Sequence, residues 1–122
     1  MGLRVIEYTI VLANTIEIFT TPMNEETLES VMLMLTETLI EPNVARGQIG
    51  IMEGGATLAH RIAVLADDYL DTLSCPAWTG SLHLNKHSYL YAAVISDTTR
   101  RFRLNAIIHD FIPPALREKP SG

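Results

Sequence analysis

The chain has 122 residues and a formal net charge of -5, and hydrophobic residues make up 48% of it against 19% charged residues. This length fits a single domain, residues 1–122, with a core that needs no disulfide or structural metal, and the negative charge argues against a nucleic-acid binder, which needs a basic surface. No apolar run approaches the roughly 18 residues of a transmembrane helix, and the N-terminus lacks the layout of a signal peptide, so we expect a cytoplasmic protein that does not bind membranes.

The composition also indicates association. A mean hydropathy of +0.19 is high for a small domain with few charged residues, which suggests apolar surface that is buried against another subunit. The one cysteine, Cys75, cannot form an internal disulfide, as expected for a reducing compartment.

Residues 4–20 have the period of β-structure, because six large apolar residues fall on even positions and Glu7, Thr9, Thr15 and Glu17 fall on odd ones. The six apolar residues are Ile6, Tyr8, Ile10, Leu12, Ile16 and Ile18. A three-residue loop at 13–15 would form a hairpin with both apolar faces inward, whereas a two-residue loop would bury Glu17. One long bent strand has the same parity and remains an alternative.

Residues 24–41 are predicted to form a helix that starts at Asn24 and stops before Pro42. Its core stripe would consist of Leu28, Val31, Met32, Leu35 and Leu39. Because Leu33 and Met34 extend the apolar surface to a second side, we expect that side to contact another subunit.

Residues 47–73 are predicted to form a short strand at 48–52, a turn at Gly54 and Gly55, and a second helix. The apolar face of this helix would carry Leu58, Ile62, Leu65, Tyr69 and Leu73, and its other face Val64, Asp67, Asp68 and Asp71. The acidic residues lie in its last turns, where the helix dipole disfavours them.

Residues 81–95 again alternate as a strand, with His83, His87, Tyr89 and Tyr91 on one face. A hairpin at Asn85–Lys86 would separate His83 from the other three, and a continuous strand is favoured because Asn-Lys is a poor hairpin turn. Residues 97–112 fit a helix narrowly better than a strand. Arg100, Arg101 and Arg103 oppose the dipole of such a helix, and residues 102–108 also alternate. Residues 113–122 are expected to form a proline-containing C-terminal arm.

These elements predict an α+β domain of two layers, with a mixed or antiparallel sheet of about four to five strands covered by two to three helices in the order ββαβαβα. Such an architecture occurs with many functions and identifies none.

Two sets of residues are candidate sites. The first is an anion site built from the backbone of Gly54 and Gly55, the side chains of Arg100 and Arg101, and the His83, His87, Tyr89 and Tyr91 face. A tight turn that needs glycine is the favoured alternative at Gly54 and Gly55. The second is an interface between subunits, in which the acidic residues 67, 68 and 71 pair with Arg103 and its neighbours, beside Leu33, Met34 and Val64.

The sequence shows no recognisable catalytic set, metal site or cofactor motif. We therefore expect a non-catalytic assembly or interaction subunit that forms a homo-oligomer, such as a structural or accessory protein of a larger particle, including a viral one. The alternative is a protein that binds or sequesters a small anionic, nucleotide-like molecule.

Overall fold

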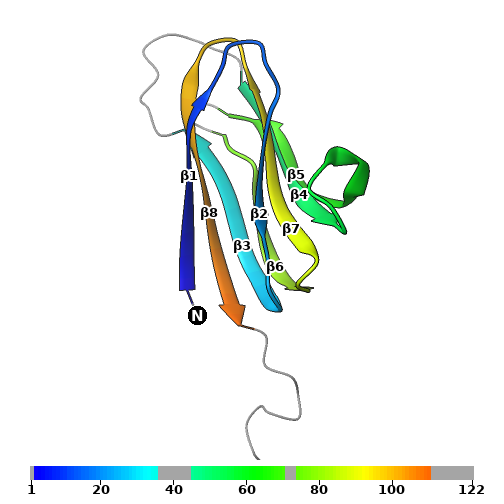
Figure 1. The fold of residues 1–122 in the computed structure, drawn as a ribbon. Helices are drawn as coiled ribbons and strands as arrows, with labels where there is room; N and C mark the ends of the chain where they lie inside the picture. The colour runs from blue at the N-terminus through cyan, green and yellow to red at the C-terminus, as the bar shows by residue number, and fades with distance from the viewer. Residues whose placement is uncertain (1, 36–44, 71–73, 111–122) are drawn as a thin grey trace, which may run out of the picture.

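Residues 2–35, 45–70 and 74–110 are described by a computed structural model, in which the regular structure is almost entirely β-strand (Figure 1). One 3-10 turn, η1 (Leu58–His60), interrupts the strands. The strands are β1 (Gly2–Val11), β2 (Glu17–Pro22), β3 (Glu26–Leu35), β4 (Ala45–Glu53), β5 (Arg61–Tyr69), β6 (Ala77–Leu84), β7 (Ser88–Ser96) and β8 (Arg100–Asp110).

The strands form two four-stranded sheets that face each other (Figure 1). Sheet A has the order β1-β8-β3-β6, sheet B has the order β2-β7-β4-β5, and all neighbouring strands are antiparallel. Successive strands therefore alternate between the sheets over much of the chain. This order is that of an eight-stranded jelly roll.

The core fills the space between the two sheets. On β8 the side chains of Phe102, Leu104 and Ala106 are buried, whereas Arg101 on the other face of the strand is exposed. The same alternation on β3 buries Val31 and Leu33 against them, and a bulge between Leu28 and Ser30 places Leu28 on the same face. On the inner strands of both sheets, alternate side chains thus point into the space between the sheets and form one continuous core.

The predicted α+β class is wrong, because the described residues contain no helix longer than η1. The expected helix at 24–41 is strand β3 as far as residue 35, the last residue described before position 45. β3 lies between β8 and β6, so both of its edges are paired. Its continuous apolar run at 31–35 suits such an inner strand as well as it suits a helix, which explains the error.

The second predicted helix is η1 followed by strand β5. Two bulges interrupt the pairing of β5 with β4: the register passes from Arg61 to Ala63 and from Val64 to Ala66. Each bulge adds one residue, Ile62 or Leu65, and shifts the period of the strand. Two of the five residues of the predicted helix stripe, Ile62 and Leu65, are thus the inserted residues of these bulges.

The strand alternative for residues 97–112 is confirmed by β8, and the narrowly preferred helix is wrong. The predicted strand at 48–52 is confirmed by β4. The C-terminal arm at 113–122 lies outside the described residues.

Strands β1 and β2 do not form the predicted hairpin. β1 pairs with β8 and β2 pairs with β7, so the chain crosses from sheet A to sheet B between them. Asn14, with φ of 57°, lies in this connection, and its N–H donates to the carbonyl oxygen of Ser96 at 2.7 Å. The parity prediction also fails on β2, where Ile18 is exposed and Phe19 packs against the core.

The predicted continuous strand at 81–95 is two strands in different sheets, β6 in sheet A and β7 in sheet B. The chain turns at Asn85, whose carbonyl accepts from the N–H of Ser88 at 3.1 Å. The Asn85 side chain accepts a second bond, from the N–H of His87 at 2.8 Å. This asparagine turn connects β6 of sheet A to β7 of sheet B.

We predict that Gly50→Ala destabilises the fold by about 2 kcal/mol or more, because no larger residue fits there. An added Cβ would overlap the carbonyl oxygen of Ala63 and lie 2.5 Å from the Tyr91 ring. Urea denaturation measures the loss. The matched control is Gly55→Ala, which meets only the exposed His60 ring and should cost about 1 kcal/mol or less. Equal losses in the two variants would contradict the packing.

Candidate functional site

The outer face of sheet B carries a polar network. On β4, Ala45, Gly47 and Ile49 face the core, so the alternate residues Arg46, Gln48 and Gly50 face outward. Gln48 pairs with Ala93 of β7 on one side and with Asp67 of β5 on the other. This position at the centre of the sheet lets the Gln48 side chain reach both neighbouring strands.

Tyr91 is the largest side chain beside Gln48. It pairs with Gly50, and its ring is fully buried although it lies on the outer face and outside the core between the sheets. The absent side chain at Gly50 is what leaves room for this ring. The Tyr91 hydroxyl donates a short hydrogen bond to Oε1 of Gln48.

The side chain of Gln48, on β4, is hydrogen-bonded to residues of both neighbouring strands, β5 and β7. Its Oε1 also accepts from Nη1 of Arg61 at 2.9 Å, and its Nε2 donates to Oδ2 of Asp67 at 3.1 Å. Nε of Arg46 donates to Oδ1 of the same carboxylate at 2.8 Å. We call Arg46, Gln48, Arg61, Asp67 and Tyr91 the Gln48 network.

The electrostatics follow these contacts. The hydrogen bonds from Arg46 and then Gln48 lower the pKa of the Asp67 carboxyl, so it is charged at neutral pH. The bond to Asp67 raises the pKa of Arg46, whose guanidinium also lies 5.7 Å from the centre of the Tyr69 ring. Burial raises the pKa of Tyr91, so its hydroxyl remains a donor.

A hollow of about 210 Å³ lies over the network. Arg46, Gln48, Arg61 and Asp67 form its polar part, and Ile16, Leu58, Ala93 and Ile95 supply the apolar walls; Gly47 and Val94 complete the lining. Leu58 belongs to η1, so the turn before β5 forms one wall. The remaining lining residues come from β4, β5, β7 and the segment before β2.

Exposed apolar side chains gather around this hollow. Seven large ones, each 39% to 63% exposed, lie on sheet B or in its flanking segments: Ile16, Ile18, Leu58, Ile62, Val64, Tyr69 and Ile95. Elsewhere in the described residues, Leu12 and Met32 are comparably exposed. We call these seven residues the sheet B apolar surface.

The predicted turn at Gly54 and Gly55 follows β4. Gly54 has φ of +81°, and its N–H donates to the carbonyl of His87 at 3.0 Å. A Cβ at Gly55 would lie 2.7 Å from the ring of His60. Gly54 thus has the conformational reason that the structural alternative expects, whereas Gly55 has no positive φ and a Cβ there would meet only the ring of the exposed His60.

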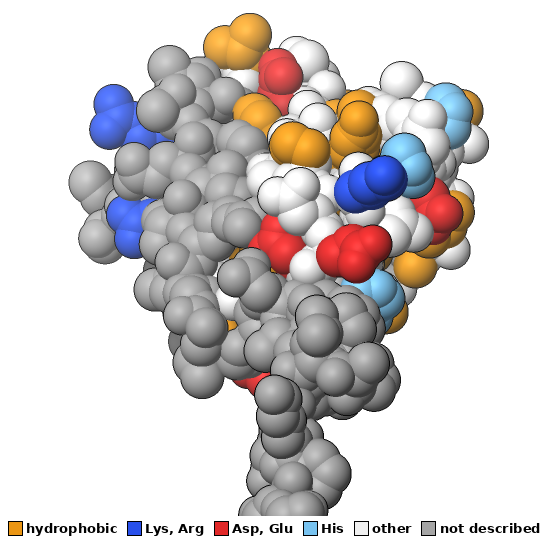
Figure 2. Space-filling view, turned by 60° about the horizontal axis from the view of Figure 1, so that its bottom comes forward, with side chains coloured by type: hydrophobic (Ala, Val, Ile, Leu, Met, Phe, Trp, Pro, Cys, Tyr) orange, Lys and Arg blue, Asp and Glu red, His pale blue; other side chains and the backbone are white. Residues whose placement is uncertain are grey.

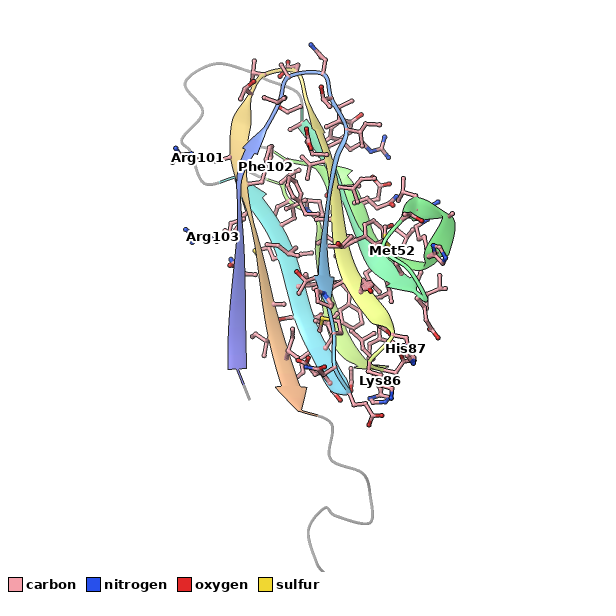
Figure 3. The ribbon with its side chains drawn as sticks, in the orientation of Figure 1. Met52, Lys86, His87, Arg101, Phe102 and Arg103 are labelled. Atoms are coloured by element: carbon pink, nitrogen blue, oxygen red, sulfur yellow. The ribbon has the colours of Figure 1, made fainter. Side chains whose placement is uncertain are left out.

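The other residues of the predicted anion site lie in different sheets. His83 is on β6 and Arg101 on β8, both in sheet A, whereas Tyr89 and Tyr91 are on β7 in sheet B. Figure 3 shows Arg101 and Arg103 on one side of the sandwich and His87 at the β6–β7 turn on the other. Arg100 begins β8. The structure does not assemble this set.

The predicted interface residues are also dispersed. Leu33 is fully buried in the core, where it cannot contact a second subunit, and Met34 on the outer face of sheet A accepts a contact from Nδ2 of Asn105 at 3.0 Å. Val64 and Asp68 are exposed on β5, and Arg103 is partly buried on β8. Asp71 lies outside the described residues. Asp67 pairs with Arg46 instead of with an arginine of β8.

No protein-family model and no curated protein matches this chain. Within residues 2–35, 45–70 and 74–110, no group of three or more His, Cys, Asp or Glu side chains is arranged to hold a metal ion. Figure 2 shows histidine side chains that are separated from one another by other side chains on the face in view. The described part of the chain has no helix that could cross a membrane. Burial raises the pKa of the Cys75 thiol, which disfavours the thiolate.

We predict that the pKa of Asp67 lies below its ordinary value of 3.8 and that Arg46→Gln raises it by removing the stronger hydrogen bond. Because the folded pKa is depressed, the carboxylate stabilises the fold above pH 3.8, and this contribution disappears as the pH falls through the lowered pKa. Carbon-detected NMR titration of the Asp67 carboxyl measures the pKa. An unchanged pKa in Arg46→Gln would show that the pairing has no effect in solution.

Proposed function

We propose that this protein is a non-catalytic assembly subunit that forms a homo-oligomer through the outer face of sheet B. The observation that carries the proposal is the sheet B apolar surface. Ile16, Ile18 and Ile95 lie on neighbouring chain segments, and Leu58 lies across the same hollow from the β2–β7 side. Ile16, Leu58 and Ile95 thus border one hollow and Ile18 lies beside them on β2, so these four side chains are gathered rather than scattered.

The size of this surface supports self-association. The seven side chains expose on the order of 700 Å², above the few hundred Å² that are ordinary for a monomer and close to the roughly 800 Å² that each partner contributes to a standard interface. A contact between two copies of the face would bury it on both partners. Such an isologous contact is the commonest kind in homo-oligomers.

The composition of the face also suits an interface. Arginine and tyrosine are the residue types enriched at the energetic centre of interfaces, and Arg46, Arg61 and Tyr69 lie among the exposed isoleucines. The hydrogen bonds of Gln48 hold this polar centre in one geometry before any partner arrives. Less side-chain entropy is then lost on association.

The β5 edge of sheet B is less suited to association than the outer face of the sheet. β5 is an edge strand, but its two bulges at Ile62 and Leu65 break the regular row of backbone groups. The carboxylates of Asp67 and Asp68 add charge at its end. Association through the face of the sheet therefore fits better than strand addition at this edge.

The jelly roll supports the further proposal of a larger particle by analogy alone. This architecture is used by the shell proteins of viruses, and also by lectins and cupins, so the fold is compatible with a structural or accessory protein of a viral particle without identifying it as one.

We predict that Ile95→Lys shifts the protein from oligomer to monomer, because a charge in the centre of the apolar surface must be desolvated on association. Sedimentation velocity at concentrations from roughly 1 to 100 μM, about two decades around typical assembly affinities, measures the shift from oligomer to monomer. The matched control is Met32→Lys, since Met32 is 39% exposed on an inner strand of sheet A and Ile95 is 41% exposed on an inner strand of sheet B.

The control variant should associate as the unmodified chain does. A monomeric unmodified protein, or loss of association in Met32→Lys alone, would contradict the proposal. Circular dichroism of both variants establishes that the β-fold is retained.

A further inference from the structure

We propose that the hollow over the Gln48 network binds a small monocarboxylate with a compact apolar body. The hollow is complete in one copy, because every lining residue belongs to one chain, but it lies in the face that is proposed to join two copies, so binding is tested at a protein concentration at which the chain is monomeric. It also differs from the anion site expected at Gly54 and Gly55, which lie outside the lining of the hollow.

The charge of the hollow favours an anion. Its lining contains Arg46 and Arg61 against the single carboxylate of Asp67, which leaves one positive charge on a chain whose formal net charge is -5. The net charge of the hollow is thus opposite in sign to the net charge of the whole chain. A local excess of this kind draws an anion to the hollow and not to the rest of the surface.

The two guanidinium groups have donors to spare. Arg46 uses Nε for Asp67, and Arg61 uses Nη1 for Gln48, so each group keeps further N–H donors for a ligand. These two internal bonds also fix the direction of each guanidinium. Fixed, planar donors match the two oxygens of a carboxylate.

A carboxylate fits the hollow better than a phosphate monoester. The site has one net positive charge, which a monoanion neutralises, whereas a dianion would leave an excess negative charge beside Asp67. The carboxyl of Asp67 remains ionised, because its hydrogen bonds to Arg46 and Gln48 persist at neutral pH. The charge count therefore selects a singly charged head group.

The apolar walls of the hollow determine the size and the chemistry of the uncharged part of the ligand. Ile16, Leu58 and Ile95 present branched aliphatic side chains around a volume of about 210 Å³. An engineered apolar cavity of roughly 150 Å³ accommodates benzene, so this hollow has room for a body of about six carbon atoms. A short branched or cyclic aliphatic carboxylate meets both requirements.

The test uses 4-methylpentanoate as the probe and 4-methylpentanamide as its uncharged match. ¹H–¹⁵N NMR titrations follow the Gln48 side-chain amide and the backbone amides of Gly47, Ala93 and Ile95. We expect saturable shifts at these positions with the carboxylate, and at least about tenfold weaker binding of the amide, the factor expected when a charged hydrogen bond is lost.

Arg61→Gln should weaken binding of the carboxylate by about tenfold or more, while Arg101→Gln, a charge-matched change at an exposed residue of β8, should leave it unaltered. If Arg61→Gln disturbs the network, Leu58→Glu tests the same point by placing a carboxylate at the wall, and it should also weaken binding. Equal affinity for the amide, shifts that map to other surfaces, or no saturable shift would overturn the proposal.

Discussion

The outer face of sheet B depends on the absence of a side chain at Gly50. Because β4 has no Cβ there, the ring of Tyr91 lies against the strand and is fully buried on a face that is otherwise open. Its hydroxyl then reaches Gln48, which in turn orients Asp67 and Arg61. One close approach between neighbouring strands thus positions the polar centre, while isoleucines on β2 and β7 provide the apolar surface around it.

The sequence predicted β4 correctly from a short apolar run at 48–52 that ends at the turn of Gly54 and Gly55. It failed in two physical situations. On β3 residues 31–35 are all apolar, so both faces of the strand are apolar there, and such a run does not distinguish a strand from a buried helix. On β5 two bulge residues, Ile62 and Leu65, change the period. Bulges are invisible until the partner strand is known, so the α+β prediction could not have been corrected from the period alone.

The candidate site was predicted only in fragments. Asp67 and Tyr91 were singled out, but with partners that lie elsewhere, and Arg46, Gln48 and Arg61 were missed. Gln48 and Tyr91 are 43 positions apart in the sequence, and their contact follows from the pairing of β4 with β7. A usable signal was present in Arg46, Gln48 and Gly50, which alternate with the apolar residues of a predicted strand. The alternation identifies the polar face of the strand, but it does not show which residues of the neighbouring strands lie beside that face.

The central claim is that the outer face of sheet B is where copies of this chain meet. The most direct measurement is methyl NMR of the isoleucines and methionines over a dilution series. We predict that the methyl signals of Ile16, Ile18 and Ile95 shift and broaden as concentration rises, while those of the buried Ile49 and of Met32 on sheet A stay constant. Signals independent of concentration in a monomeric protein, or changes confined to Met32, would contradict the claim.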